Sequence, residues 1–267
     1  MSENHPIKDY ALVFAANNAF SPGFLVTLAS ALASSDLKNF NIHFLHDEDE
    51  NVDQIVAEAQ RICRSFDFPE QNFITTPIDL HPFKVCDAYA GNYLAYARIQ
   101  AIKLLDESRI IYLDSDMLVI GDLSELIQSI PETVALAAAH DTVLLTHDND
   151  GYLLDGKTGS PNSKYFNSGL LVLNTSECNK IDLLGKFKSL TSRLVNANYA
   201  DQSYLNVIFE NQWFEIPPQW NRMTTPTAPD AIFSEPDSAK ILHYITARKP
   251  WCYAEPSAPN VLWHSLA

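Results

Sequence analysis

The sequence predicts an α/β fold in which a mixed, mostly parallel sheet is flanked by helices. In about the first 120 residues, short β-branched or aromatic runs alternate with longer segments of helical spacing, which is typical of βαβ units. The run 109–113 is apolar enough for a strand buried on both faces, as the central strands of a parallel sheet are.

Strands and helices are expected in alternating order along this part of the chain. Strands are predicted at 10–15, 41–45 and 72–76, and the first helix begins at Ser21-Pro22 and extends to about residue 33. A second helix follows from the helical spacing of Val52, Ile55, Val56, Ala59, Ile62 and Cys63. A third helix, 94–105, precedes the strand 109–113.

The second half of the chain has a looser pattern. Strands are expected at 134–139 and 169–173, and the polar segment 146–163 between them is predicted to be a long loop. Helices are expected at 181–196 and 202–209. The Pro-rich stretch 217–236 excludes long regular elements. The length of 267 residues and the 46% hydrophobic content fit a single domain, 1–267, with a polar N-terminal extension, 1–9.

Composition limits the function and the compartment. The formal net charge of −15 argues against nucleic-acid binding, because most of the surface repels phosphates. The four cysteines form no CxxC pair, so we expect reduced thiols rather than a zinc site or a disulfide scaffold. Segment 1–9 lacks the apolar core of a secretory signal, and no run of about 18 apolar residues occurs. We expect a cytoplasmic protein without a transmembrane segment, which leaves peripheral membrane contact open.

The sequence Asp114-Ser115-Asp116 lies directly after the buried strand 109–113, where open α/β sheets bind ligands. Two close carboxylates repel each other unless a cation or proton compensates, so the motif predicts a Mg²⁺ or Mn²⁺ site. One alternative is a solvated acidic turn. Another is an aspartyl-phosphate phosphatase, but that class carries the motif on its first strand, with Thr or Val shortly after it, whereas Met117-Leu118-Val119 follow here.

Further motifs follow in a specific order along almost the whole chain, from about residue 10 to 251. They are Val13-Phe14-Ala15-Ala16-Asn17-Asn18, Tyr96-Ala97-Arg98, Ile111-Tyr112-Leu113-Asp114-Ser115-Asp116, Phe166-Asn167-Ser168-Gly169, Asp201-Gln202, His243-Tyr244 and Lys249-Pro250-Trp251. In this order they resemble the family 8 glycosyltransferases, the group containing glycogenin and the bacterial lipopolysaccharide galactosyl- and glucosyltransferases.

The resemblance implies a Rossmann-like nucleotide-sugar-binding domain of the glycosyltransferase A type. It implies a retaining hexosyltransferase that moves glucose or galactose from a UDP-sugar to a glycan, a lipid-linked glycan as in lipopolysaccharide biosynthesis, or another hydroxyl acceptor. By matching position, Asp114, Asp116 and His243 would bind Mn²⁺ or Mg²⁺, and the C-terminal part, 217–267, would close the donor site. Two carboxylates and one imidazole leave coordination positions for the donor phosphates, which agrees with this assignment.

The resemblance also assigns the nucleoside contacts. Ala15, Ala16 and Asn17 would border the uracil, and Ser115 the ribose. Two positions depart from the family pattern. Asn17 stands where bacterial members usually carry Asp, and Thr246 stands where a phosphate-contacting Gly is usual, which predicts a more rigid or shifted loop.

The remaining site residues would contact the diphosphate and the sugar. Arg98 would bind the donor diphosphate or sugar, the alternative being an exposed helical arginine. Lys249 would stabilise the leaving diphosphate, the alternative being a solvated surface lysine. Asn167 and Asp201 would hydrogen-bond the transferred sugar, and Gln202 would lie near its reacting carbon. Asp201-Gln202 would also suit a helix N-terminus.

Asp141 follows the predicted strand 134–139 and matches a family position near the sugar and acceptor. Retention of configuration can proceed through a covalent intermediate or by front-side attack. Since Gln202 is a poor nucleophile, we favour front-side attack, with Asp201 as the alternative nucleophile. The competing function is a catalytically silent nucleotide-sugar-binding protein. The intact charged cluster argues against it, because an unused buried charge cluster is destabilising.

Overall fold

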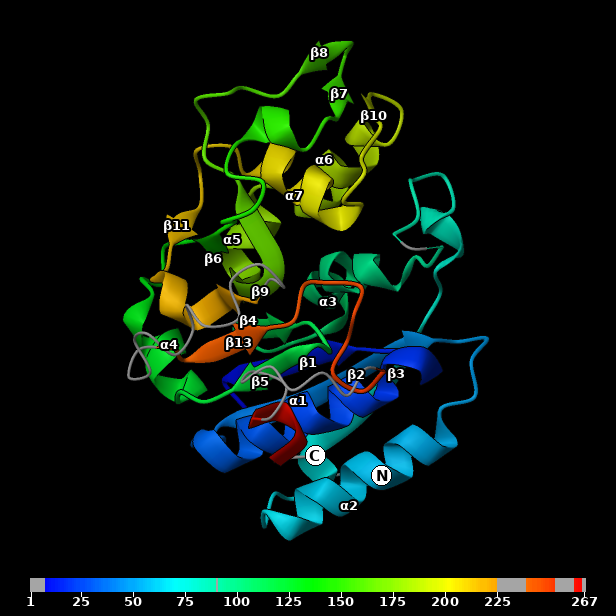
Figure 1. Cartoon of the computed structure of the whole chain (residues 1–267), viewed down its shortest axis with the longest axis vertical. Coiled ribbons are helices and arrows are strands. Elements are labelled where there is room, and N and C mark those ends of the chain that lie inside the picture. Colours follow the sequence, from blue (N-terminus) through cyan, green and yellow to red (C-terminus); the bar gives the residue numbers. More distant parts are fainter. Residues whose placement is uncertain (1–7, 90, 225–238, 253–261, 266–267) are drawn as a thin grey trace.

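The computed structural model describes residues 8–89, 91–224, 239–252 and 262–265. A seven-stranded sheet with the order β11-β6-β9-β4-β1-β2-β3 forms its centre (Figure 1). Its strands are β1 (Tyr10–Ala15), β2 (Phe40–Asp47), β3 (Phe73–Ile78), β4 (Arg109–Leu113), β6 (Leu136–His140), β9 (Phe166–Asn174) and β11 (Phe214–Glu215). Strand β9 is antiparallel to β4 and β6, and the other neighbours in this sheet are parallel. The predicted mixed, mostly parallel sheet is confirmed.

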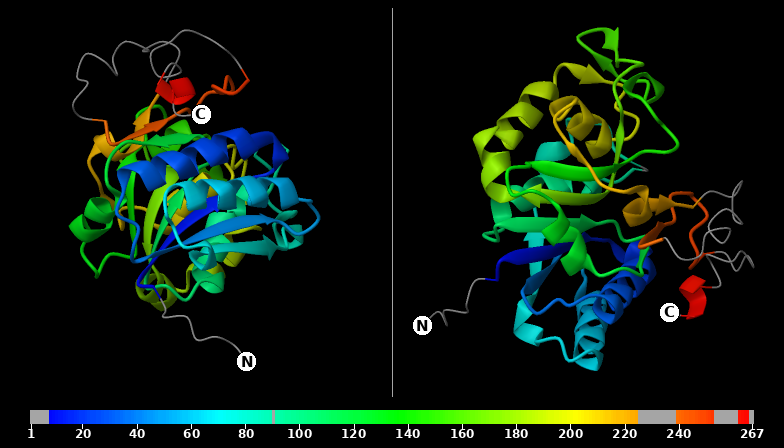
Figure 2. Two further views of the ribbon diagram at one scale, coloured as in Figure 1. Left: turned by 90° about the horizontal axis from the view of Figure 1, so that it is seen from below. Right: turned by 90° about the vertical axis from the view of Figure 1, so that its left-hand side faces the viewer.

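Helices cover both faces of this sheet. On one face lie α1 (Ser21–Ser34) and α2 (Asp53–Ser65), which are in front of the sheet in the left view of Figure 2. The opposite face is covered by α3 (Ala97–Leu104), α5 (Thr175–Lys180), α6 (Leu183–Leu190) and α7 (Asp201–Ile208). Helix α4 (Leu123–Ser129) packs into the core on the α1 side.

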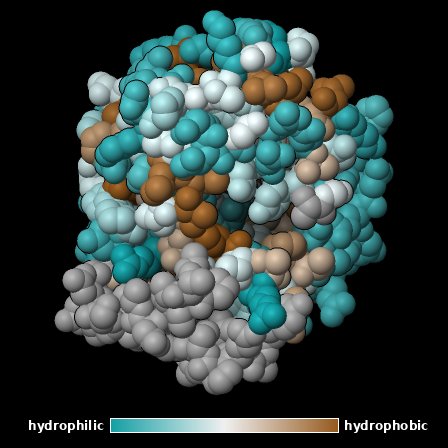
Figure 3. All heavy atoms as spheres, turned by 45° about the horizontal axis from the view of Figure 1, so that its top comes forward, coloured by the Kyte–Doolittle hydropathy of each residue, from teal (hydrophilic) through white to brown (hydrophobic). Residues whose placement is uncertain are grey.

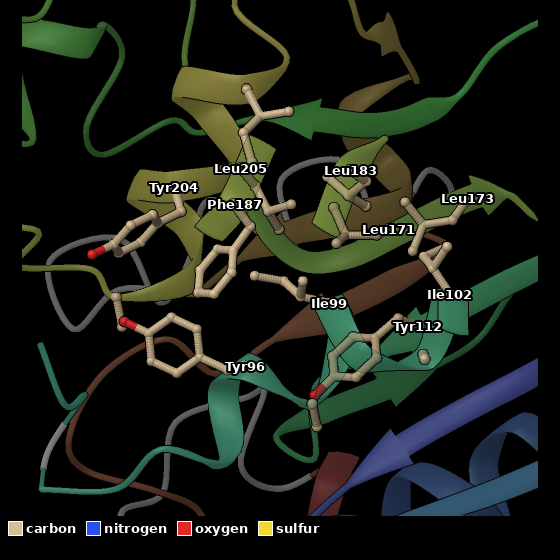
Figure 4. Close-up of a cluster of buried hydrophobic side chains, with 14 of the residues drawn as sticks. Tyr96, Ile99, Ile102, Tyr112, Leu171, Leu173, Leu183, Phe187, Tyr204 and Leu205 are labelled. Carbon is tan, nitrogen blue, oxygen red and sulfur yellow. The ribbon is translucent and has the colours of Figure 1, made fainter. Parts of the chain in front are cut away.

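Each face of the sheet has its own hydrophobic core, because alternate residues of a strand point to opposite faces. In β4, Ile110 and Tyr112 belong to the core under α3, α6 and α7, and Ile111 and Leu113 belong to the core under α1 and α2. Figure 4 shows Tyr112 of the first core among side chains from α3, α6, α7 and β9. The strand is therefore buried on both sides, as its apolar run predicts.

Short elements complete the described structure. A three-stranded sheet contains β5 (Met117–Val119), β12 (Arg222–Met223) and β13 (Ile241–His243). A second one contains β7 (Leu153–Leu154), β8 (Lys157–Thr158) and β10 (Leu194–Val195). The 3₁₀ helices are η1 (Asn18–Phe20), η2 (Glu70–Asn72), η3 (His81–Phe83), η4 (Leu94–Tyr96), η5 (His147–Asn149) and η6 (Pro218–Asn221).

Two predictions in the second half are corrected. The helix predicted at 181–196 begins only after Asp182, which has a φ of 51° and caps α6, and it ends at Leu190. Leu194 and Val195 instead pair with β7, because Leu194 becomes buried against the sheet contributed by the polar segment 146–163. That segment is thus not a bare loop, since it carries η5, β7 and β8. The predicted irregular stretch 217–236 lies outside the described residues from 225 onwards.

No helix in the described ranges combines the length and the apolar composition needed to cross a bilayer. The four cysteines are free thiols, and Cys252 is the exposed one. Burial raises the pKa of both Cys63 and Cys178 to about 12, so these thiols are protonated and unreactive at neutral pH.

Candidate metal and donor site

Asp114, Ser115 and Asp116 form the turn that follows β4. The backbone N–H of Asp114 donates to the Gly169 carbonyl of β9 at 2.8 Å, and the Ser115 hydroxyl donates to the Ala15 carbonyl at the end of β1 at 2.7 Å. The carbonyl of Asp116 accepts from the Tyr244 N–H at 2.9 Å. The turn is thereby tied to both sheet neighbours of β4 and to the C-terminal segment.

Strand β13 brings His243 back to this turn. It pairs antiparallel with β5, and His243 lies opposite Met117. The imidazole Nε2 lies 3.2 Å from Asp116 Oδ1 and 3.9 Å from Asp114 Oδ2. One ligand atom from each of Asp114, Asp116 and His243 lies within 4.8 Å of the others. The structure thus brings His243 to two aspartates that lie more than 100 residues earlier in the sequence.

Gly169 of β9 makes this approach sterically feasible. A Cβ atom at this position would lie 2.3 Å from His243 Cε1 and 2.9 Å from Asp114 Oδ2, closer than side chains can come. The absence of a side chain at Gly169 therefore permits close approach of the residues that would hold the ligand.

The donor atoms suit a divalent cation. Asp116 Oδ1 is buried and has no hydrogen-bond partner within the described part of the chain. Burial raises the pKa of Asp116, but the adjacent imidazole and the Lys249 ammonium outweigh burial and hold that pKa well below its usual range. The carboxylate is therefore ionised. Carboxylate oxygens with one imidazole nitrogen are ligands that Mn²⁺ and Mg²⁺ accept, so the residues fit the expected ion.

Arg98 lies beneath these carboxylates and is only 4% exposed, so the alternative of an exposed arginine is wrong. Its Nη2 donates to Asp114 at 2.7 Å, and its Nε lies 3.0 Å from Asp201 Oδ2. Its guanidinium stacks 4.5 Å from the centre of the Tyr112 ring. Burial disfavours the charge, but Asp114 and Asp201 outweigh burial, so the pKa of Arg98 lies above its usual value. Arg98 therefore holds two site carboxylates in place.

Asp201 and Gln202 open helix α7 and point at Ser168 of β9. Asp201 accepts from the Ser168 hydroxyl at 3.0 Å, and Gln202 Oε1 accepts from the Ser168 N–H at 2.8 Å. Burial raises the pKa of Asp201 to about 7, although Arg98 opposes the shift. Helix α7 begins at Asp201, so this pair lies at a helix N-terminus as predicted, with Ala200 in the N-cap position.

Asp141 and Asn167 connect the sugar-binding candidates to one another. Asp141 Oδ1 accepts the N–H groups of Val143 and Leu144, both at 2.8 Å, which fixes the turn after β6. Its Oδ2 accepts from the amides of Asn167 at 3.1 Å and Gln202 at 3.3 Å. All three predicted sugar contacts, Asn167, Asp201 and Gln202, therefore lie in one buried network with Asp141.

Lys249 faces the acidic turn rather than solvent, so the surface-lysine alternative is wrong. Its Nζ donates to Asp116 Oδ2 and to the Tyr244 carbonyl, each at 2.6 Å. Nearby, the Thr246 hydroxyl donates to the Arg248 carbonyl at 3.2 Å. The residue that stands in place of the usual glycine therefore makes a hydrogen bond within the loop between His243 and Lys249.

The residues predicted to border the uracil lie at the end of β1. The Ala15 carbonyl accepts a hydrogen bond from the Ser115 hydroxyl, so the residue predicted to border the uracil is bonded to the residue predicted to border the ribose. Ala16 is buried. Asn17 caps η1, and its Oδ1 accepts from the Phe20 N–H at 3.1 Å. The amide oxygen that would meet the base is therefore engaged within its own loop.

Two residues at the site were not singled out from the sequence. Asn221 lies in η6, and its Oδ1 lies 2.9 Å from His243 Nδ1; the sequence marks this position only by the two prolines shortly before it. Tyr89 lies near the carboxylates: desolvation and the charges of Asp114, Asp116 and Asp201 raise its pKa. It comes from a segment without periodicity, so the sequence gives no signal for it.

Comparison with known proteins decides the family. The model of Glycosyl transferase family 8 matches residues 11–255. The chain belongs to this family. Similar proteins include the probable glycosyl transferase Gly of Streptococcus gordonii, which is 29% identical over 178 residues, covering 64% of this chain and 24% of that protein. The glycosyltransferase GlyA of Streptococcus pneumoniae is 23% identical over 254 residues, covering 94% of this chain and 34% of that protein. The chain spans about a third or less of the length of these two relatives.

Solved structures of two glycosyltransferases have the same fold. The galactosyltransferase LgtC, crystallised with donor and acceptor sugar analogs, superimposes with a TM-score of 0.77 at 19% identity, covering 96% of this chain and 94% of that one. The glycosyltransferase GlyE of Streptococcus pneumoniae has a TM-score of 0.69 at 21% identity, covering 97% of this chain and 60% of that one. The fold is of the glycosyltransferase A type, as predicted.

Proposed function

We propose that this chain is a metal-dependent, retaining hexosyltransferase that uses a UDP-sugar donor, with glucose or galactose as the hexose. The observation that carries the proposal is the convergence of Asp114, Asp116 and His243, with ligand atoms within 4.8 Å of one another, after the central strand β4. Bound Mn²⁺ or Mg²⁺ would supply positive charge for the donor diphosphate.

The neighbouring side chains have separate tasks in this proposal. Arg98, buried under Asp114 and Asp201, holds both carboxylates and sets the floor of the donor site. Lys249 Nζ lies 2.6 Å from Asp116 and stabilises the charge that develops on the leaving diphosphate. The turn of Ser115 and the loop of Ala15, Ala16 and Asn17 border the nucleoside.

The chemistry of Gln202 favours front-side attack. Its amide is neutral and is bound at both ends, by the Ser168 N–H and by Asp141, so it orients the sugar rather than attacking it. Asp201 is buried and paired with Arg98, which lowers its value as a nucleophile. The acceptor hydroxyl therefore attacks on the face from which UDP leaves and passes its proton to the departing phosphate oxygen, which conserves the anomeric configuration.

The acceptor is a glycan hydroxyl, free or lipid-linked, in this proposal. LgtC, which shares the fold, was crystallised with an acceptor sugar analog. Hydrophobic side chains gather beside a central hollow on the face shown in Figure 3, and Val143 and Leu145, close to Asp141 in the sequence, are 52% and 47% exposed. Exposed apolar side chains of this kind suit contact with a lipid portion or an apolar part of an acceptor. The cytoplasmic location, the single-domain organisation and any role in lipopolysaccharide synthesis stay predictions.

A donor screen tests the proposal. The purified chain is incubated with UDP-glucose, UDP-galactose and other nucleotide sugars, with Mn²⁺, Mg²⁺ or EDTA, and UDP release is measured with and without glycan acceptors. We expect release that depends on the metal and on a UDP-hexose. The Asp116→Asn variant should lose it by about 100-fold or more, because a carboxylate ligand is removed.

Asp182→Asn is the matched control, since asparagine caps α6 as well as aspartate does and Asp182 lies outside the site. Equal UDP release with EDTA and with Mn²⁺, or full activity of Asp116→Asn, would contradict the metal-dependent reaction. Nucleotide-sugar binding without turnover under all conditions would instead favour the silent binding protein. The anomeric configuration of the product, determined by NMR, tests retention.

A further inference from the structure

Asn221 bridges the predicted metal ligand His243 and the sugar-binding network. It ends η6, directly after the Pro217-Pro218-Gln219-Trp220 segment, and is 2% exposed. Its Oδ1 lies 2.9 Å from His243 Nδ1, and its Nδ2 lies 2.9 Å from Asn167 Oδ1. Both ends of one buried amide are therefore committed to site residues.

The direction of this amide follows from groups that can only donate or only accept. The backbone N–H of Gly169 can only donate, and it points at Asn167 Oδ1 from 3.0 Å. Asn167 Nδ2 accordingly donates in the other direction, to Asp141 Oδ2. With Asn167 Oδ1 fixed as an acceptor, its second neighbour must be the NH₂ group of Asn221. The carbonyl oxygen of Asn221 therefore faces His243.

This orientation determines which nitrogen of His243 carries the proton. Because Asn221 Oδ1 can only accept, Nδ1 of His243 must donate to it. The neutral imidazole then has its lone pair on Nε2, which faces Asp116 Oδ1 at 3.2 Å and Asp114 Oδ2 at 3.9 Å. A metal ion placed between Nε2 and the two carboxylates would therefore meet three ligand groups.

We propose that Asn221 is a positioning residue that selects the Nδ1–H tautomer of His243 and so prepares the metal site. The inference rests on the proposed metal-dependent function and deepens it. It also links two parts of the site, because Asn167, Gly169 and Asp141 set the direction of the Asn221 amide. Residues in the sugar-binding network thereby act on the metal ligand without touching the metal.

The experiment has two independent readouts. The tautomer is measured in the metal-free wild type, at an alkaline pH at which the imidazole ring is neutral, by long-range ¹H–¹⁵N correlation, with the His243 signals assigned from their absence in His243→Gln. Mn²⁺ affinity is measured by calorimetry for the wild type, Asn221→Ala, Asn221→Asp and the control Asn174→Ala. Asn174 is a comparably buried amide at the other end of β9, bonded to the Glu132 carbonyl and to the start of α5.

We expect the Nδ1–H tautomer in the wild type and about 10- to 100-fold weaker Mn²⁺ binding in Asn221→Ala. Asn221→Asp keeps an acceptor for Nδ1–H and should bind Mn²⁺ more tightly than Asn221→Ala, while Asn174→Ala should bind as the wild type does. An Nε2–H tautomer in the wild type, or unchanged Mn²⁺ affinity in folded Asn221→Ala, overturns the inference. Absence of Mn²⁺ binding by the wild type overturns the proposed metal site instead. The tautomer measurement does not depend on Mn²⁺ binding, so it still decides the role of Asn221 in that case.

Discussion

Replacing Gly169 with alanine should disturb the metal site more than the fold. The added Cβ would lie 2.3 Å from His243 Cε1, whereas carbon atoms in contact are about 3.5 Å apart, so the imidazole or β9 must move by about 1 Å. The second near atom, Asp114 Oδ2 at 2.9 Å, belongs to another ligand, so two of the three ligands are displaced. Overpacking of this kind destabilises a protein by about 1–3 kcal/mol.

Calorimetric titration with Mn²⁺ and urea denaturation of the same variant test this reasoning. We expect at least about 10-fold weaker Mn²⁺ binding in Gly169→Ala, because a ligand displaced by about 1 Å no longer meets the metal geometry. Gly185→Ala is the matched control: its Cβ also meets close atoms, but all of them belong to the Asp182 side chain that caps α6, away from the proposed ligands. Wild-type Mn²⁺ affinity in folded Gly169→Ala would refute the close approach of β9 to the ligands.

Three further perturbations address other parts of the molecule. The pKa of Asp201 is about 7 in the folded protein, above its ordinary 3.8, so ionising Asp201 costs more in the folded than in the unfolded chain. The free energy of unfolding of the metal-free wild type should therefore fall by about 1.4 kcal/mol per pH unit from pH 5 to pH 7, relative to Asp201→Asn. If urea denaturation gave the same pH dependence for both proteins, this expectation would be contradicted. Lys249→Ala should lower kcat for UDP release about 100-fold and leave Mn²⁺ binding intact, since it removes the ammonium and no ligand; an unchanged kcat would exclude Lys249 as the clamp. Glu107→Ala breaks the buried pair in which Glu107 Oε1 lies 2.8 Å from His43 Nε2, in a part of the sheet remote from the proposed metal ligands. The free energy of unfolding should fall by about 3 kcal/mol, and kcat of the folded fraction should stay unchanged. A reduced kcat would show that the two regions are coupled.

The sequence predicts the strands best where burial is continuous. The strand predicted at 109–113 matches β4, and that at 10–15 matches β1, because an apolar run buried on both faces leaves little freedom of register. The region 181–196 fails because two-residue strands such as β10 form only through pairing with a distant segment. Local periodicity contains no information about that partner.

The same distinction applies to the site. Asp114 and Asp116 are identifiable from the strand that precedes them, since the end of a buried central strand is where such sheets bind ligands. His243 enters the prediction only through family resemblance, because the pairing of β13 with β5 joins segments more than 100 residues apart. Asn221 is missed altogether: its role depends on a chain of hydrogen bonds through Asn167 that no spacing in the sequence reveals.

The charges around the turn explain why the proposed donor site needs a cation. Three carboxylates, Asp114, Asp116 and Asp201, share two basic partners, Arg98 and Lys249, so the cluster is one negative charge in excess when all are ionised. A diphosphate approaching this cluster would meet repulsion in a partly buried, low-dielectric setting, where charges interact strongly. A divalent ion held by Asp114, Asp116 and His243 would reverse the sign of the cluster, and it would also relieve Lys249 of neutralising Asp116. In the proposed reaction the ammonium would then turn to the diphosphate, so the metal and Lys249 would act together on the same leaving group.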